Sequence, residues 1–272
     1  MRPSIPIRRI RAAAGFSLVE LAVVMTIVAL LLGGLIFTLS AQTEQRNFEE
    51  TRRRLDQARE LLLGYAIVNG RLPCPATAVS SGDESPVGGG ACTTGFSGWL
   101  PARTIGFQPT DDTGFAIDVW GNRIRYAVSV SVPFNTVAPQ VCRPAGAAPV
   151  TPHFTHKDNM RTNGIDCQPN DLLICKSANL PPAITATTCG GAANQIMTTS
   201  LVVAIIFSTG KNGAQAPCAT CIDELANLDG NATFVSHVPA PNTAANGEFD
   251  DQFTWIAVGE LYGKLIAAGQ LP

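Results

Sequence analysis

The sequence predicts an α+β fold in which a long N-terminal helix packs on a small antiparallel sheet that carries disulfide-rich loop insertions. Three observations support this class. An apolar run at residues 16–39 continues into an amphipathic helical pattern that reaches residue 68. Short apolar or alternating runs follow it, and the chain of 272 residues contains 25 glycines, 19 prolines and eight cysteines. This length leaves room for a hydrophobic core and one or two domains.

Composition excludes several classes of protein. Hydrophobic residues make up 46% of the chain and charged residues 15%, so the chain is not an acidic or basic disordered protein. The formal net charge of −2 does not indicate a strongly basic nucleic-acid binder, and no nucleic acid is expected as a partner. The high, even cysteine count indicates an oxidising compartment.

The N-terminus combines a basic head with a long apolar stretch. Residues 1–15 contain four arginines and no acidic residue, whereas Glu20 is the only charged residue in 16–39. As a helix, that stretch is long enough to cross a hydrocarbon core of about 30 Å, and the positive-inside rule places residues 1–15 in the cytoplasm. An ordinary secretory signal has a shorter apolar region and a small-residue cleavage site, and residues 40–42 form a poor site. An uncleaved membrane anchor remains the alternative.

Glu20 favours a different interpretation, because an acidic residue in a membrane helix costs about 2.5–3.5 kcal/mol and a plain anchor has no use for it. The segment GFSLVE from Gly15 to Glu20, together with the basic leader and the long apolar run, resembles the type IV prepilin signature. The resemblance implies that prepilin peptidase cuts between Gly15 and Phe16 and then N-methylates Phe16. It also implies that Glu20 meets the amino terminus of a neighbouring subunit and sets the axial register.

The same resemblance implies a domain organisation, a location and a set of partners. Residues 1–15 would be the leader peptide, 16–69 the long helix with a transmembrane part at about 16–39, and 70–272 a periplasmic pilin-like globular domain. The expected location is the bacterial inner membrane, with a cytoplasmic N-terminus, or a periplasmic or surface filament. The expected partners are prepilin peptidase, other pilin or pseudopilin subunits, an inner-membrane assembly platform and membrane lipid. Phe37 stands where filament-forming type IV pilins usually carry proline, which weakens the case for a major pilin.

The helical pattern continues beyond the apolar run. Residues 41–68 contain no proline, and Asn69-Gly70 is a helix stop signal. The apolar positions of this stretch recur at helical intervals, at Phe48, Leu55, Leu62 and Ala66. The basic run 52–54 is interpreted as a solvated face paired with acidic neighbours rather than as a phosphate or DNA site.

Two short segments resemble the type II secretion pseudopilins. Residues 65–73, YAIVNGRLP, resemble the point at which the chain leaves the long helix in that family, with Leu72 in place of an aromatic residue. Residues 118–126, DVWGNRIRY, resemble the family's Asp-Pro-Trp-Gly-Asn turn before the first strand, with Val119 in place of proline.

The globular region contains a series of short elements. Residues 123–132 alternate strictly, which predicts a strand whose apolar face packs against the long helix. Residues 201–207 are apolar almost throughout and predict a central strand, while 172–174 and 232–238 are lesser strand candidates. Residues 251–268 suggest a terminal helix that ends before Gly269.

Two segments are predicted to be exposed, disulfide-stapled insertions, at residues 133–200 and 74–98, and loops of this kind tend to carry specific recognition. Eight cysteines allow 105 pairings, and the sequence does not choose among them. Pairing of neighbours would join Cys74 to Cys92, Cys142 to Cys167, Cys175 to Cys189, and Cys218 to Cys221. The last pair is interpreted as a structural disulfide rather than as a redox motif or half of a zinc site, because neither context is evident.

Catalytic motifs are not evident, so the chain is not expected to be an enzyme. His153 and His156 have too few partners for a metal site, and neither a P-loop nor a Gly-x-Ser-x-Gly elbow occurs. Calcium is the one cofactor that the resemblance suggests, because major pseudopilins bind it in a C-terminal loop. Asp250 and Asp251, in the acidic segment 246–251, offer the hard oxygen ligands that this ion prefers. The alternative role of the two residues is to cap the terminal helix.

The sequence is thus interpreted as a structural subunit of a pilus-like filament that is processed by prepilin peptidase. The preferred machine is a type II secretion system, in which the chain is a pseudopilin. One alternative is a large minor pilin of a type IV pilus that acts in adhesion, motility or DNA uptake. The other is an uncleaved, membrane-anchored periplasmic binding domain that keeps residues 1–15 and has little need of Glu20.

Overall fold

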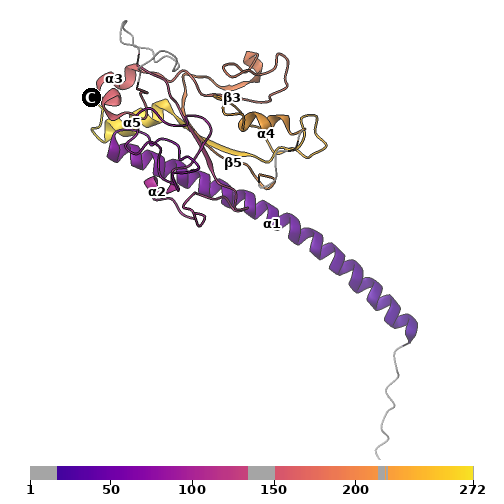
Figure 1. Cartoon of the computed structure of the whole chain (residues 1–272). Helices are drawn as coiled ribbons and strands as arrows, with labels where there is room; N and C mark the ends of the chain where they lie inside the picture. The colour runs from indigo at the N-terminus through magenta and orange to yellow at the C-terminus, as the bar shows by residue number, and fades with distance from the viewer. Residues whose placement is uncertain (1–16, 134–150, 214–217, 219, 272) are drawn as a thin grey trace, which may run out of the picture. The chain divides into compact units, whose positions relative to one another are not determined.

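The computed structural model describes residues 17–133, 151–213, 218 and 220–271, with the side chains of 32–41 left aside. The chain has two compact units, Met1–Arg46 and Asn47–Pro272, and the division falls within the first helix. That helix, α1, runs from Leu18 to Asn69 (Figure 1). It ends where the sequence predicts. Gly70 has φ +69°, a left-handed conformation that glycine adopts freely, and its N–H donates to the carbonyl of Ala66 at 2.7 Å.

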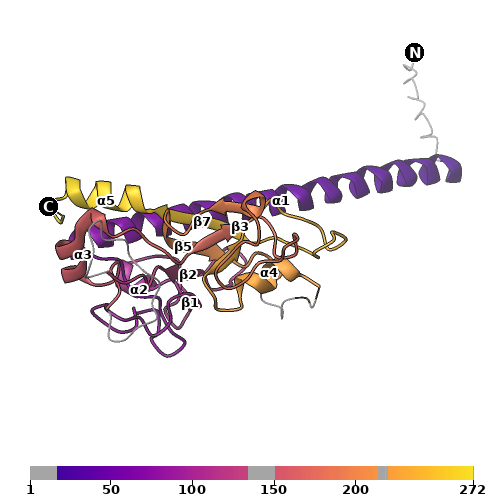
Figure 2. The same ribbon diagram turned by 90° about the horizontal axis from the view of Figure 1, so that it is seen from above.

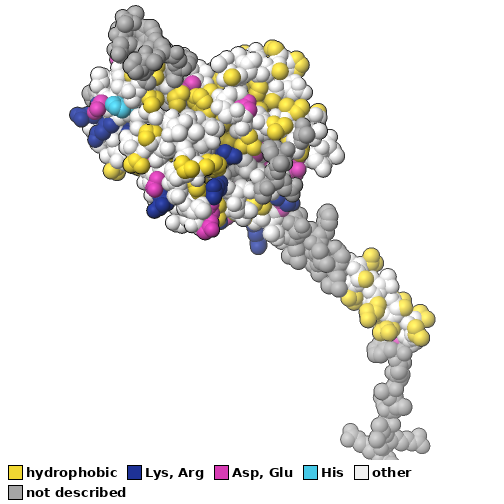
Figure 3. All heavy atoms as spheres, in the orientation of Figure 1, with side chains coloured by type: hydrophobic (Ala, Val, Ile, Leu, Met, Phe, Trp, Pro, Cys, Tyr) yellow, Lys and Arg dark blue, Asp and Glu magenta, His cyan; other side chains and the backbone are white. Residues whose placement is uncertain are grey.

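The described part of the first unit is an apolar helix. Its large apolar side chains are exposed, from 42% for Val28 to 86% for Leu18, and Figure 3 shows them gathered along this stretch. Among the described residues, no helix is both long enough and apolar enough to cross a membrane. Phe16 and residues 32–39 of the predicted span lie outside the described side chains.

The second unit is built on a four-stranded antiparallel sheet, here called the main sheet. Its strands are β1 (Gly98–Trp99), β2 (Arg125–Val128), β5 (Val202–Ser208) and β7 (Gln252–Ala257), in the order β1-β2-β5-β7 (Figure 2). Tyr126 of β2 is opposite Ile206, and Trp255 of β7 is opposite Ile205, so β5 has a neighbour on each side. Every residue of β5 is buried, which confirms the central strand predicted at 201–207.

The larger core lies between α1 and one face of the main sheet. Leu55 and Leu62 of α1 pack with Tyr126 and Val128 of β2 and with Leu261 of α5 (Val258–Ala267), and none of these side chains is more than 1% exposed. Figures 1 and 2 show α5 beside the C-terminal part of α1. Burial of each such leucine contributes about 1.5–3 kcal/mol. The predicted packing of an apolar strand face against the long helix is confirmed, although the strand is shorter than the alternation suggests.

A second, three-stranded sheet covers the other face of the main sheet. Its strands are β3 (Leu173–Cys175), β4 (Gln195–Met197) and β6 (Thr233–Val235), in the order β4-β3-β6, and β3 runs parallel to β6. Ile174 and Phe234 pack there against Ile205 and Phe207 of β5. Short helices lie among the loops, at α2 (Ala102–Ile105), α3 (Lys157–Asn163) and α4 (Ile222–Asn227), together with 3-10 turns at Gly164–Asp166 and Ala192–Asn194.

The second sheet corrects the prediction for residues 133–200. An exposed insertion was expected, but the described part, 151–200, contributes β3 and β4 and a buried interior that includes Phe154 and Met160. The reason is that β3 finds its parallel partner in β6, beyond the predicted insertion, and the pair buries apolar side chains against β5. Residues 134–150 lie outside the described residues.

The C-terminal segment also corrects a prediction. Residues 251–268 were expected to form one helix, but Gln252–Ala257 form strand β7 and only Val258–Ala267 form helix α5. Pairing with β5 decides the matter, because Phe253 stacks on Phe207 with ring centroids 4.8 Å apart. The residue before α5 is Ala257, so the alternative role of Asp250 and Asp251 as helix caps is wrong.

Both edges of the main sheet are occupied by groups from outside it. At β1, Ala76 exchanges two backbone hydrogen bonds with Trp99, of 2.8 and 3.0 Å. At β7, Nε of Arg59 donates to the carbonyl of Trp255 at 3.0 Å, while its guanidinium also pairs with Glu260. Neither edge presents a full row of free backbone groups.

Three disulfides join the neighbours that pairing along the sequence would join: Cys74 with Cys92, Cys175 with Cys189, and Cys218 with Cys221. Cys167 is also disulfide-bonded. Cys142 lies outside the described residues, so the pairing of Cys142 with Cys167 stays a prediction.

Candidate functional site

The first turn of α1 contains a reciprocal pair of hydrogen bonds. The Oγ of Ser17 accepts the N–H of Glu20 at 3.2 Å, and the carboxylate of Glu20 accepts the N–H of Ser17 at 3.4 Å. This is a capping box, in which two backbone donors that the helix leaves unsatisfied are satisfied by side chains. The Ser-x-x-Glu spacing is a sequence signal for it that our sequence analysis missed. Glu20 is thus exposed and bonded within its own turn.

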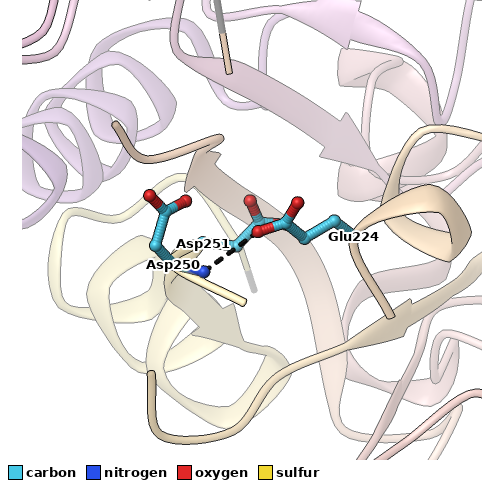
Figure 4. Close-up of side chains that lie close together, drawn as sticks. All are labelled: Glu224, Asp250 and Asp251. Carbon is cyan, nitrogen blue, oxygen red and sulfur yellow. Dashed lines mark hydrogen bonds between the residues drawn. The ribbon is translucent and has the colours of Figure 1, made fainter. Parts of the chain in front are cut away.

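A cluster of three buried carboxylates lies in the second unit. Glu224 comes from α4, while Asp250 and Asp251 immediately precede β7, and a carboxylate oxygen from each lies within 4.8 Å of the others. Figure 4 shows the side chains of Glu224 and Asp251 next to each other and the N–H of Asp250 directed at Glu224. The sequence predicted the two aspartates as metal ligands and missed Glu224, which lies far from them in the chain. We call these residues the carboxylate cluster.

Uncharged donors hold the members of the carboxylate cluster. Glu224 accepts the N–H of Asp250 at 3.0 Å and the side-chain amide of Asn212 at 3.0 Å. Asp251 accepts the side-chain amide of Asn227 at 2.7 Å. The Oδ2 of Asp250 accepts the backbone N–H groups of Lys211 and Asn212, at 2.8 and 3.3 Å. Its Oδ1 is buried and has no hydrogen-bond partner within the described part of the chain.

Burial raises the pKa of all three carboxyl groups. It raises the pKa of Asp250 to about 6, with the charge of Glu224 acting in the same direction. It raises the pKa of Asp251 well above its ordinary value, against the attraction of Arg125, and it raises the pKa of Glu224. Three buried anions close together are costly unless they take up protons or share a cation. The oxygen-only donor set would suit Ca²⁺ among the common cations.

The N-terminal turn lies within a known sequence motif. Residues 10–36 match the family model of the prokaryotic N-terminal methylation motif. The chain carries a prepilin-type signature. No curated protein and no solved structure matches the chain significantly.

The prepilin-type signature supports a type IV pilin-like or pseudopilin subunit. It implies processing by prepilin peptidase and assembly with other pilin subunits. The match includes Gly15, Phe16 and Glu20. Gly15 and Phe16 lie outside the described residues, so cleavage and methylation at this bond stay predictions.

A buried ion pair fixes the chain where it leaves α1. The guanidinium of Arg71 donates two bonds to the carboxylate of Glu84, of 2.8 and 2.7 Å, and both residues are less than 10% exposed. Glu84 also accepts the N–H groups of Cys74 and Gly88, both at 3.1 Å, and the hydroxyl of Tyr65 at 3.2 Å. The loop closed by Cys74 and Cys92 is therefore attached to the end of α1 by one carboxylate.

The turn at Asp118 attaches the start of the sheet to α1 in a similar way. One oxygen of Asp118 accepts the N–H of Asn122 at 2.8 Å, and the other accepts the hydroxyl of Ser208 at 2.6 Å. Arg54 of α1 donates to the carbonyl of Asp118 at 2.7 Å, and the ring of Trp120 meets that of Phe48 edge-on at 5.2 Å. The two segments that resemble pseudopilins thus both contact the C-terminal part of α1.

Proposed function

We propose that the chain is a structural subunit of a pilus-like filament, and specifically a pseudopilin of a type II secretion system. The observation that carries the proposal is a prepilin-type signature at the start of a single helix, α1, whose C-terminal part forms the core of a globular unit. A protein of this design has no reaction to catalyse, and its work is to anchor, assemble and present the globular unit.

The proposed sequence of events begins at the cytoplasmic face of the inner membrane. Prepilin peptidase cuts between Gly15 and Phe16 and methylates the new amino terminus. The apolar run 16–39 stays with the mature chain, first as a membrane anchor and then as a packing surface among other subunits. Glu20 exchanges its bond to Ser17 for the charged amino terminus of a neighbour, which sets the axial register because charges interact strongly in an apolar medium.

The contacts at the end of α1 favour the secretion system over a type IV pilus. The bidentate pair of Arg71 with Glu84 and the Asp118 turn are the local structures of the two segments that resemble pseudopilins. The large second sheet, beyond what a compact subunit needs, favours the alternative of a large minor pilin. Cell fractionation distinguishes the two. Mature protein confined to the membrane fraction is expected for a pseudopilin, and mature protein in sheared surface fibres would contradict that assignment.

The mass of the mature chain tests processing in the same samples. We expect a chain that begins at Phe16 and carries one added methyl group. A full-length chain that retains residues 1–15 would contradict the filament proposal and leave the anchored binding domain as the explanation.

Replacement of Glu20 tests the register argument. We expect Glu20→Ala to leave cleavage intact and to lower incorporation into the filament by about ten-fold or more, which corresponds to roughly 1.4 kcal/mol or more of lost contact energy. Ser17→Ala is the matched control, because it removes the local cap and keeps the carboxylate. If Ser17→Ala lowers incorporation as much as Glu20→Ala, the role of Glu20 is helix capping and not register.

We further infer that the carboxylate cluster binds a cation of the calcium type. The support is the short separation of its three buried carboxylates and the Oδ1 of Asp250, which has no hydrogen-bond partner among the residues that the structure describes. Calorimetric titration of the chelator-treated full chain with CaCl₂ tests this. We expect saturable binding of one ion, and no heat above dilution would contradict it.

A further inference from the structure

A cavity of about 540 Å³ opens where β2 ends and where β3, β5 and β6 begin. Its lining comes from segments far apart in the sequence. Phe96 belongs to the loop after Cys92, Asn170 and Asp171 precede β3, and Asn231 precedes β6. The cavity therefore lies among loops that adjoin strand ends of both sheets, and it takes walls from both segments that the sequence predicts as recognition loops.

Fixed contacts hold one wall of this cavity. The carboxylate of Asp171 accepts the N–H groups of Val130 and Leu172, at 2.7 and 2.9 Å, and so joins the end of β2 to the start of β3. Next to it, the Oδ1 of Asn170 accepts the hydroxyl of Thr199 at 3.3 Å. These bonds place an amide and a hydroxyl at the wall without the help of a ligand, which is the usual state of a small-molecule site.

Another part of the lining belongs to the loop between Cys175 and Cys189. The disulfide closes this loop, and backbone bonds between Thr185 and Thr188 turn its tip, so that Thr187 faces the cavity. Gly230, which also lines the cavity, approaches Ser97, the residue after Phe96. The cavity is thus bounded by three separately fixed segments.

The chemistry of the lining selects a neutral ligand. Phe96 supplies a half-buried aromatic ring, and Asn170, Thr187 and Thr199 supply an amide and hydroxyls that both donate and accept. The side-chain amide of Asn231 is held within its own loop by Asp229 and by the N–H of Thr233. None of the residues known to line the cavity is Lys, Arg or His. The only charged one is Asp171, whose two oxygens already accept backbone N–H groups. An anion would enter without a cation to neutralise it, and that is costly.

We propose that this cavity binds one ring of a neutral oligosaccharide. A sugar ring has an apolar C–H face that can lie on Phe96 and hydroxyl groups around its edge that match amides and hydroxyls. A cavity of this size lies within the range of roughly 300–1,000 Å³ of small-molecule sites. The site is independent of the N-terminal motif, so its function does not rest on the proposed filament assembly.

The test is a binding experiment on the full chain in lauryldimethylamine oxide, because maltoside detergents would themselves carry a sugar. The probes are cellotriose, maltotriose and the N-acetylglucosamine trimer, with trigalacturonate as the anionic contrast and trileucine as the peptide contrast. Saturation-transfer NMR and a titration report binding. We expect at least one neutral trisaccharide to bind saturably and trigalacturonate and trileucine to bind at least about ten-fold more weakly, a difference of roughly 1.4 kcal/mol.

Two variants locate the binding. Ala186→Trp places a large side chain at the exposed rim of the cavity, and Phe96→Leu keeps an apolar side chain but removes the ring. Val79→Trp is the control, because Val79 is 91% exposed and does not line the cavity. We expect Ala186→Trp to weaken the sugar by about ten-fold or more, and Val79→Trp to leave it unchanged.

Three results would overturn the proposal. They are no saturable binding of any neutral trisaccharide, equal or tighter binding of trigalacturonate or trileucine, and unchanged binding by Ala186→Trp in a folded chain. Folding of each variant is checked by circular dichroism on the same sample. Incorporation of these variants into the filament is expected to be normal, so a failure here is distinguishable from a failure of the assembly proposal.

Discussion

Two regions of the second unit bury carboxylates, and they do so in opposite ways. At the end of α1, Glu84 is 5% exposed and Arg71 is 7% exposed. The carboxylate of Glu84 accepts hydrogen bonds from both terminal guanidinium nitrogens of Arg71. In the carboxylate cluster, Asp250 and Asp251 are as deeply buried, at 6% and 5%, but their hydrogen-bond donors are uncharged.

The charge of the hydrogen-bond donors decides in which direction the pKa of each carboxyl group is shifted. Burial works to raise the pKa of Glu84, but the bonds from Arg71 and from the N–H groups of Cys74 and Gly88 hold it below its usual value. Burial raises the pKa of Asp250 to about 6, and the backbone bonds from Asn212 and Lys211 oppose this shift only in part. The first site is complete as an ion pair, whereas the second gains from a proton or a metal ion. The charge of the partners, and not the depth of burial, thus distinguishes the carboxylate of Glu84 from those of the carboxylate cluster.

The largest expected effect comes from removal of the cation of the first site. Arg71→Met leaves Glu84 buried without its partner, and we expect a loss of about 3–5 kcal/mol in the free energy of unfolding. Urea denaturation of the full chain measures it. The double variant Arg71→Met with Glu84→Leu should recover most of the loss, because it removes both charges. A loss below about 1 kcal/mol in the single variant would contradict the contrast between the sites, since that is the value of an exposed pair.

The second largest effect is expected at Asp250, where a substitution should stabilise the chain rather than destabilise it. Asp250→Asn removes one buried charge from the carboxylate cluster, and we expect it to raise the free energy of unfolding at neutral pH by about 1–2 kcal/mol when calcium is chelated. The same variant should lose the stabilisation that calcium gives the native chain. Thermal denaturation with chelator and with CaCl₂ measures both. Equal responses of the native chain and the variant to calcium would show that the ion binds elsewhere.

The pH dependence separates the sites further. Folding raises the pKa of Asp250, so the ionised carboxylate lowers the free energy of unfolding. This loss is absent below about pH 4 and grows as the pH rises towards about 6. The advantage of Asp250→Asn over the native chain should therefore increase across that window. The pKa of Glu84 is lowered on folding, so its contribution is present above the unfolded value and is lost as pH falls through the folded one. Denaturation curves of Asp250→Asn and Glu84→Gln against the native chain measure these trends, and parallel trends would contradict the comparison.

The smallest effect is expected at an exposed pair in the same loop as Glu84. Arg103 lies 3.7 Å from Asp83, with the two side chains 57% and 45% exposed. We expect Arg103→Met to change the free energy of unfolding by less than about 0.5 kcal/mol, because solvent screens such pairs. If Arg103→Met lowered the free energy of unfolding as much as Arg71→Met, removal of any charge near this loop would be destabilising, and the burial of Arg71 and Glu84 would not explain the effect.

Sequence reasoning found the features that depend on local order. The apolar run and the stop at Asn69-Gly70 lie in one continuous stretch, so their spacing predicted α1. The resemblance of residues 15–20 to the prepilin signature predicted the motif. The central strand at 201–207 was evident because a strand buried on both faces is apolar almost throughout. The sequence left the disulfide pairing open, and the structure joins neighbouring cysteines at Cys74–Cys92, Cys175–Cys189 and Cys218–Cys221.

Features that depend on distant partners were missed. Glu224 joins Asp250 and Asp251 only because α4 packs beside the start of β7, and no pattern near the aspartates points to it. The second sheet needs the parallel pairing of β3 with β6 across a long connection. Residues 252–257 carry apolar side chains at positions that suit a helix as well as a strand, and the choice was made by β5.

The occupied edges of the main sheet have a consequence for how copies of this protein can associate. An open strand recruits another strand, which is the route to uncontrolled aggregation. Ala76 pairs with the edge at β1, and Arg59 occupies one carbonyl of the edge at β7. Arg59 belongs to α1, so the helix that carries the assembly signal also closes the sheet. Under the proposed filament assembly, one half of α1 serves ordered growth and the other half helps to protect the sheet edge against disordered association.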